Sequence, residues 1–249
     1  MSRYLAHAIT RRATGGPGVG LRGLPLRWIQ SGALGLWATE WSGDATLARA
    51  DAFAHHDLVA ALCDAGPCLP VRFGTWFANE EVARRSVGEG EARFAAAVDR
   101  LADRQEVAVT LLWRDAVAAV LPAPASRTPA EPPSGNLPRP GRSFLDRKRA
   151  VHAPGEERRQ TAEALAARLT AELAVDQADV RQETCPSGEV ALSLSLLARR
   201  DEAGALKARA TTAVAELPDV RGVVSGPWPP YSFTEDLGDP REVGVAGGA

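Results

Sequence analysis

Apolar residues recur along the first half of the chain in short runs that are typical of β-strands. Residues 4–10 and 26–39 are apolar with few charges, and the second run predicts a hairpin that reverses at Ser31-Gly32. Residues 69–73 and 106–113 predict further extended segments. In the last of these, apolar residues occupy both alternating faces, so we expect burial on both sides.

Helical spacing appears between these runs. From Asp44 to about Asp64 an apolar residue recurs every three or four positions, and the Asp44 carboxylate is a candidate cap for the first free amides. Residues 79–86 and 91–102 show the same spacing. Strands and helices in mixed order predict an α+β domain.

The second half repeats this mixture. Residues 143–173 predict a long helix, interrupted or bent near Pro154, and residues 190–196 alternate strictly between apolar and small residues, as in a strand with one packed face. The other predicted elements are strands at 180–184 and 220–224 and a helix from Asp201 to Pro218. We expect the strand at 180–184 to form a hairpin with 190–196 through a turn at 186–188.

A proline-rich segment separates the halves. Seven of the 18 prolines fall between Pro122 and Pro140, where apolar periodicity is lost. The predicted fold is therefore α+β with two small domains, at residues 1–120 and 142–235. Residues 121–141 would be the linker and residues 236–249 a flexible tail.

Charge excludes some classes of partner. The 249 residues carry 29 Lys and Arg against 31 Asp and Glu, a net charge of −2, which disfavours a general binder of nucleic acid or of anionic membranes. The opening sequence lacks the apolar core of a signal peptide, and the uncharged, glycine-interrupted stretch at residues 28–39 is too short to cross a bilayer. We expect neither export nor a membrane partner.

Cysteines and histidines near one another are candidate metal ligands. Cys63, Cys68 and Cys185 are an odd and sparse set, which predicts no disulfide framework and fits a reducing cytoplasm. His55 and His56 precede the first two cysteines, but a second matched ligand pair is missing. We therefore predict incidental or buried thiols, a histidine pair that packs or hydrogen-bonds, and no metal.

Catalytic and cofactor motifs are weak. Residues 18–23 match the dinucleotide pattern GxGxxG, but the strand-like residues 24–28 follow where a helix is needed. The chain has no GxSxG, HExxH or P-loop motif. The basic run at 142–149 contains two apolar residues and favours a solvated helix face over a phosphate site. We predict no catalytic residue and no cofactor.

Two peptides, 67–77 and 226–233, combine aromatic residues with prolines and carry almost no titratable groups. Rigid backbone and large rings suit docking better than catalysis. The residues predicted to define the structure, some of them at a partner surface, are Arg72, Phe73, Trp76, Trp228, Tyr231 and Phe233. Either both peptides are internal, or part of their surface meets another protein. Arg72 is predicted to donate hydrogen bonds to carbonyl groups near its bend.

These peptides carry a family resemblance. Together with the helix containing His55, the strand start at Glu106-Val107 and the segment 141–149, they resemble the GvpF/GvpL family of gas vesicle proteins, in the family's order and over most of residues 4–233. The resemblance implies an N-terminal domain similar to a modified ferredoxin-like fold and a second α+β domain. The glycine-rich stretch 15–23 and the linker depart from the commoner pattern.

The resemblance also implies a function. We expect a non-catalytic accessory protein in the cytoplasm or on the gas vesicle, which contacts the small hydrophobic shell protein and other accessory proteins during assembly. It leaves open the F-like or L-like branch and whether the protein stays in the vesicle. The residues alone leave two rivals, a small-molecule sensor, which needs a polar pocket, and an RNA-binding module, which needs exposed aromatic and basic strand residues.

Overall fold

The described part of the chain forms two compact units. The computed structural model describes residues 2–13, 18–42, 46–114, 142–184, 189–218 and 220–234, with side chains of the long helix from residue 156 onward. The first unit combines residues 1–107, 197–204 and 226–249, and the second combines 108–196 and 205–225. Both units therefore draw on either side of the proline-rich segment, whereas the sequence predicted one domain before it and one after it.

The first unit contains an antiparallel sheet. Its strands are β1 Ser2–Thr10, β2 Leu26–Ser31, β3 Leu34–Ser42, β4 Cys68–Pro70 and β5 Trp76–Phe77. The order is β2-β3-β1-β4, with β5 also paired to β1. The predicted hairpin is confirmed as β2 and β3. A ferredoxin-like motif has a helix between its first two strands. Here only a short 3-10 turn at Leu21–Gly23 lies between β1 and β2, and the first helix, α1, connects β3 to β4. The ferredoxin-like description of this sheet therefore stays a prediction.

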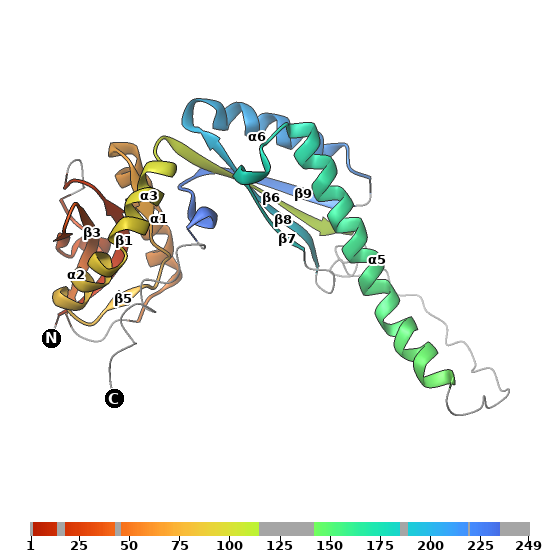
Figure 1. The fold of residues 1–249 in the computed structure, drawn as a ribbon, viewed down its shortest axis with the longest axis horizontal. Coiled ribbons are helices and arrows are strands. Elements are labelled where there is room, and N and C mark those ends of the chain that lie inside the picture. Colours follow the sequence, from red (N-terminus) through yellow and green to blue (C-terminus); the bar gives the residue numbers. More distant parts are fainter. Residues whose placement is uncertain are drawn as a thin grey trace. The chain divides into compact units, whose positions relative to one another are not determined.

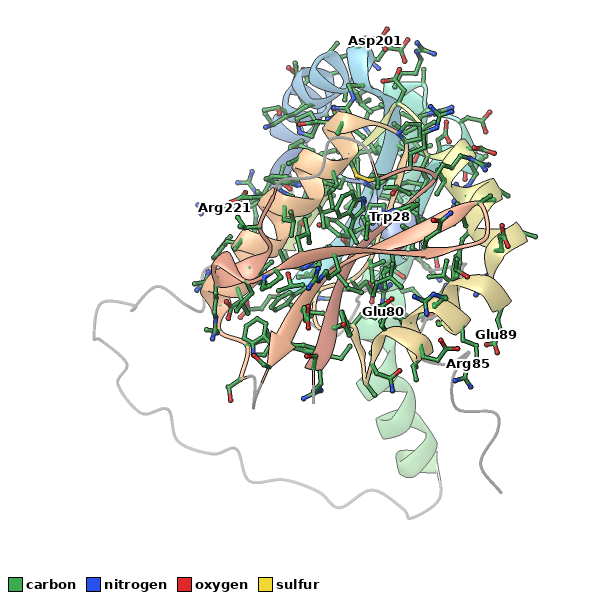
Figure 2. All side chains as sticks on the ribbon, turned by 90° about the vertical axis from the view of Figure 1, so that its left-hand side faces the viewer. Trp28, Glu80, Arg85, Glu89, Asp201 and Arg221 are labelled. Atoms are coloured by element: carbon green, nitrogen blue, oxygen red, sulfur yellow. A yellow bond between two sulfur atoms is a disulfide. The ribbon has the colours of Figure 1, made fainter. Side chains whose placement is uncertain are left out.

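Helices cover both faces of this sheet. They are α1 Arg49–Ala65 on one face and α2 Glu80–Glu89 with α3 Glu91–Arg100 on the other, and Figure 2 shows the sheet between them. In β3, Leu34 and Leu36 face α2 and α3, and Trp37 and Trp41 face α1. Because successive side chains of β3 point to opposite faces of the sheet, the strand contributes residues to two separate hydrophobic cores.

Local signals set where these helices begin. The Asn79 side chain accepts a hydrogen bond from the Val82 amide at 2.9 Å and caps α2, whose charged residues Glu80, Arg85 and Glu89 are labelled in Figure 2. Helix α1 begins at Arg49 rather than directly after Asp44, which lies outside the described residues.

The four-stranded sheet has the order β7-β8-β6-β9. Its strands are β6 Arg104–Trp113, β7 Val180–Thr184, β8 Val190–Arg199 and β9 Val220–Trp228, and its helices are α5 Arg142–Leu173 and α6 Arg200–Ala215. The element order is β-α-β-β-α-β, the order of ferredoxin-like motifs. Both helices lie over one face of the sheet (Figure 1). The predicted α+β class is confirmed.

Strand β6 differs from its prediction in two ways. The sequence assigned it to the N-terminal domain with both faces buried, whereas the structure pairs it with β8 and β9. Val107, Val109 and Leu111 are fully buried, but the alternating residues 108, 110 and 112 are only half-buried, because the helices cover one face. Periodicity reveals that a strand needs partners, not which strands they are.

The remaining predicted elements follow the sequence with small shifts. Helix α5 is continuous through Pro154, without the predicted interruption, and Leu169 and Leu173 of its apolar stripe are buried. Strand β9 is longer than predicted, because it continues to Trp228. The predicted linker at 121–141, the turn at 186–188 and the tail at 236–249 lie outside the described residues.

Two phenylalanines offer a matched test of this packing. Phe94 of α3 is 1% exposed and Phe53 of α1 is 60% exposed. We expect Phe94→Ala to lower the free energy of unfolding by about 3–5 kcal/mol, because it removes a fully packed ring. We expect Phe53→Ala to change it by no more than about 0.5 kcal/mol. Urea unfolding of both variants checks this, and equal losses would contradict the assigned core.

Candidate functional site

Within the first unit, the C-terminal aromatic peptide, residues 226–234, is anchored by hydrogen bonds to Glu106 and Arg100. The buried Glu106 carboxylate accepts from the Ser232 amide at 2.9 Å and from its hydroxyl at 2.7 Å. The Arg100 guanidinium donates to the Phe233 carbonyl at 2.8 Å. Bonds to charged groups are stronger than neutral ones, so the backbone of this peptide is firmly placed.

Backbone geometry adds to this anchoring. Gly226 has a φ of 101°, and a Cβ there would lie 2.6 Å from the Glu106 carbonyl oxygen. This position therefore requires glycine. Phe233 is fully buried in the core shared with α2 and α3. The peptide thus begins at a position that requires glycine and contains a fully buried aromatic ring near its end.

Three aromatic rings from two segments gather around the two histidines of α1. The ring of Phe73 lies 5.3 Å from His55, and the ring of Trp228 meets His56 edge-on at 4.9 Å. Tyr231 lies 6.5 Å from His55 and 6.1 Å from His56. Edge-on and offset rings are favourable arrangements, so this cluster fixes Trp228 beside α1.

The Tyr231 hydroxyl is the unusual group of the cluster. It is buried and has no hydrogen-bond partner among the described residues. Burial, and secondarily the Glu106 carboxylate, raise the pKa of Tyr231 above its usual range, so the phenol stays neutral. An unpaired buried hydroxyl is costly, which makes it a hydrogen-bond donor without a described acceptor.

Beneath these rings, hydrogen bonds connect the sheet to α1. His7 is the extra residue where the register of β1 shifts against β3, between Ala6 and Ala8. Such a bulge re-aims a side chain, and the His7 ring reaches His55, with 2.9 Å between their Nδ1 atoms. His55 Nε2 lies 3.0 Å from the Val71 carbonyl oxygen.

These hydrogen bonds form a continuous line, and the direction of each one follows from the groups at its two ends, the Val71 carbonyl and the Leu21 amide. The Val71 carbonyl can only accept, so His55 Nε2 carries the proton and its Nδ1 accepts from His7 Nδ1. His7 Nε2 therefore accepts from the Thr39 hydroxyl at 2.7 Å, and that oxygen accepts from the Leu21 amide at 3.1 Å. Every donor has one acceptor only when both imidazoles are neutral.

The electrostatics agree with this assignment. Burial, and then the neighbouring His55, hold the pKa of His7 well below its usual range. Burial lowers the pKa of His55 to about 4, against the opposing effect of its bond to Val71. All four ring nitrogens are engaged within the protein, so the line holds α1 against the sheet.

A hollow of about 270 Å³ lies beside the cluster. Its lining residues come from α1, the start of β6, the first residue of α6 and the aromatic peptide, and include His56, Asp64, Arg104, Arg200 and Trp228. Arg200 pairs with Asp64 and donates to the Cys63 carbonyl at 2.8 Å. The hollow thus combines an aromatic wall with two arginines and the carboxylate of Asp64.

The structure brings only part of the predicted site together. Phe73, Trp228 and Tyr231 gather at α1, whereas Trp76 packs edge-on against Trp41 at 5.7 Å in the core on the α1 side. Phe233 is fully buried elsewhere in the unit, and Trp228 is 39% exposed.

Arg72 is exposed, and its carbonyl accepts from the Thr75 hydroxyl at 2.9 Å. The predicted bonds from its guanidinium to nearby carbonyls stay a prediction.

Sequence reasoning missed His7, Thr39 and Glu106. A histidine and a threonine inside apolar strands are weak signals of buried hydrogen bonds. The predicted histidine pair is partly correct: His55 is buried and hydrogen-bonded, but its partner is His7, and His56 packs on Trp228.

The cysteine prediction is wrong for two of the three residues. Cys63 and Cys68 form a disulfide, visible as the yellow bond in Figure 2, with 5.2 Å between their Cα atoms. The turn at Gly66-Pro67 brings the end of α1 back to the start of β4, which spacing alone did not reveal. Cys185 lies outside the described residues.

The described residues contain no group of three or more His, Cys, Asp or Glu side chains able to hold a metal ion. Within the same part of the chain, no helix is long and apolar enough to cross a membrane.

The histidine line predicts acid sensitivity. Because both pKa values are lowered on folding, their contribution to stability is complete above about pH 6.5 and is lost progressively as the pH falls below it, for His55 down to about pH 4. Each histidine adds a slope of up to about 1.4 kcal/mol per pH unit. We expect His7→Asn to reduce the slope by about half, measured by urea unfolding between pH 6.5 and about pH 5.

Leu62→Ala is the control for this experiment. It removes a buried contact of α1 but no titrating group, so it should cost about 2–5 kcal/mol and keep the slope. A flat pH profile of the unchanged protein in this window would contradict the neutral pair.

Comparison with known proteins places these features in a family. Gas vesicle protein L of Streptomyces sp. (strain CB03234) is 30% identical over 208 residues, which span 78% of this chain and 74% of that protein. Crystal structures of gas vesicle protein GvpF from Anabaena sp. PCC7120 and from Microcystis aeruginosa each match with a TM-score of 0.67, at 15% and 14% identity.

These matches are nearly complete. The Anabaena structure covers 94% of this chain and 96% of its own, and the Microcystis structure covers 93% and 98%. At such low identity they show the fold alone. The family model described as "Gas vesicle synthesis protein GvpL/GvpF" matches residues 4–235, so the predicted resemblance is confirmed and the chain belongs to the GvpL/GvpF family of gas vesicle synthesis proteins.

Proposed function

We propose that the protein is a non-catalytic accessory factor of gas vesicle assembly whose first unit binds the small hydrophobic shell protein. Family membership supports an accessory role in gas vesicle formation. The observation that supports a binding surface is the exposure of Trp228 on a peptide whose backbone is anchored at Glu106 and Arg100. A role in the cytoplasm or on the vesicle, with further accessory partners, belongs to the same proposal.

The binding surface would be the aromatic strip, defined as Phe53, His56, Pro227 and Trp228. Phe53 and His56 are three residues apart on α1 and so lie on one face of the helix. The Trp228 ring contacts His56 and extends this face onto the aromatic peptide. Phe53 is 60% and Trp228 39% exposed, which is unusual for such large rings.

The physical advantage of this strip is that it is ordered before binding. Glu106, Arg100 and the buried Phe233 hold the peptide, so little conformational entropy remains to be lost on association. Aromatic rings presented in this way are typical hot spots of protein interfaces. An apolar partner would remove them from water, which is favourable at about 25 cal/mol per Å² of apolar surface.

The absence of catalysis is supported by the occupancy of the polar groups at the site. His7 and His55 use all their ring nitrogens within the protein. Glu106 is engaged by Ser232, and Arg200 by Asp64. These groups maintain the shape of the site, which is what a binding surface needs.

We expect Trp228→Ala to weaken binding of the shell protein at least about tenfold while leaving the fold intact, because the ring is partly exposed. Co-purification of the tagged protein with co-expressed shell protein measures this binding.

In a strain that lacks the gene, the Trp228→Ala variant should then fail to restore gas vesicles. The matched control is Val19→Ala, a residue 58% exposed outside the strip, which should bind normally. Unchanged binding by Trp228→Ala in a folded protein would refute the assignment.

A further inference from the structure

The two sheets differ in how their edges are protected. Edge strands expose unpaired amides and carbonyls, which natural proteins shield with charges, prolines or short strands. At the β2 edge, Arg84 Nε donates to the Gln30 carbonyl at 3.2 Å. The opposite edge of that sheet consists of the short strands β4 and β5. The β7 edge carries Arg181, Gln182 and Glu183.

Strand β9 carries these protections only near its two ends. It ends the strand order β7-β8-β6-β9. Arg114 donates to the Val220 carbonyl at one end and Pro227 lies near the other, whereas residues 221–225 contain one charge and no proline. Val223 is 58% exposed, one of the most exposed large apolar residues described. Among the described edges, β9 is therefore the long apolar one that is open to a further strand.

A groove runs beside this edge. A cavity of about 350 Å³ is lined by the end of α6 and by β9, including Val214, Leu217, Val220 and Val224. Gly222 lets the strand approach the helix, because a Cβ there would collide with Val214. An added strand would find backbone partners along β9 and apolar lining at its side, the arrangement used in β-strand addition.

The charge at the groove restricts the partner. The two charged lining residues are Arg114 and Arg221, both exposed, and neither has an ion pair with a carboxylate among the described residues. Arg114 Nε donates to the Val220 carbonyl at 3.3 Å, so its charge is fixed at the end of the edge. Arg221, labelled in Figure 2, extends from the strand itself. Carboxylates complement such a pair.

We propose that the β9 edge binds an extended segment of another protein, which adds a strand to the four-stranded sheet, places apolar side chains in the groove and pairs acidic side chains with Arg114 and Arg221. This surface belongs to the second unit and goes beyond the aromatic strip of the first. It gives the protein a second, independent contact, specific for acidic extended chains.

The probe is a short fluorescent peptide of alternating valine and threonine with glutamate at both ends. Fluorescence anisotropy with the full chain should show binding, at least about tenfold tighter than for the same peptide with lysine in place of glutamate. A version with N-methylated backbone amides should bind at least about tenfold more weakly, because it cannot pair with β9. Amide exchange at residues 220–225 should slow when the glutamate peptide binds.

Variants test the assigned residues. Arg221→Glu should abolish the preference for the glutamate over the lysine peptide, because Arg114 then faces a glutamate of opposite charge, and Val223→Lys should weaken binding of both peptides. Trp228→Ala should leave peptide binding unchanged, which separates this proposal from the function of the aromatic strip. Both edge substitutions are at exposed positions, and circular dichroism checks that the variants fold.

Three results would overturn the proposal. The first is equal binding of the glutamate and lysine peptides, or no binding of either below about 1 mM. The second is Arg221→Glu with unchanged preference. The third is a concentration-dependent dimer in sedimentation that Val223→Lys converts to monomer, because the edge would then serve a second copy of this chain.

Discussion

The first unit depends on two neutral histidines that point their Nδ1 atoms at each other. The hydrogen-bonded line from Leu21 through Thr39, His7 and His55 to Val71 crosses from the sheet to α1. It fixes the rotation of α1 about its own axis, because His55 must face inward. His56, the next residue, therefore faces the aromatic peptide, and Phe53 faces solvent. The exposed strip is a consequence of a buried polar contact.

A second constraint is the distance in sequence between the parts of this unit. Glu106 and Ser232 are separated by 126 residues, and Arg100 and Phe233 by 133. The core that holds Phe233 is thus incomplete until nearly all of the described chain has been synthesised. Loop closure over such separations costs entropy that local helices do not pay, so we infer that the aromatic peptide docks late in folding. The binding surface would then form only on a chain that has already folded.

Periodicity was enough to predict most helices and strands, because one buried face imposes spacing that the sequence displays directly. Val107, Val109 and Leu111 are an example, since their alternation predicts a strand whatever its partners are. The partners of that strand could not be predicted, because pairing across a long insertion leaves no local pattern. The bulge at His7 and the disulfide at Cys63 depend likewise on backbone geometry.

The amino-acid composition revealed the aromatic peptide of the candidate site, but it did not reveal the residues that anchor this peptide. Glu106 looks like an ordinary charged residue at the start of a strand, and only its burial beside Ser232 reveals its role. The same reasoning explains the contrast between the two proposed surfaces. The strip presents rings on a fixed backbone and so suits an apolar partner, whereas β9 presents backbone groups between two arginines and so suits an extended acidic one. Because the strip lies in the first unit and Arg114 and Arg221 in the second, the two contacts use different groups and can be lost separately.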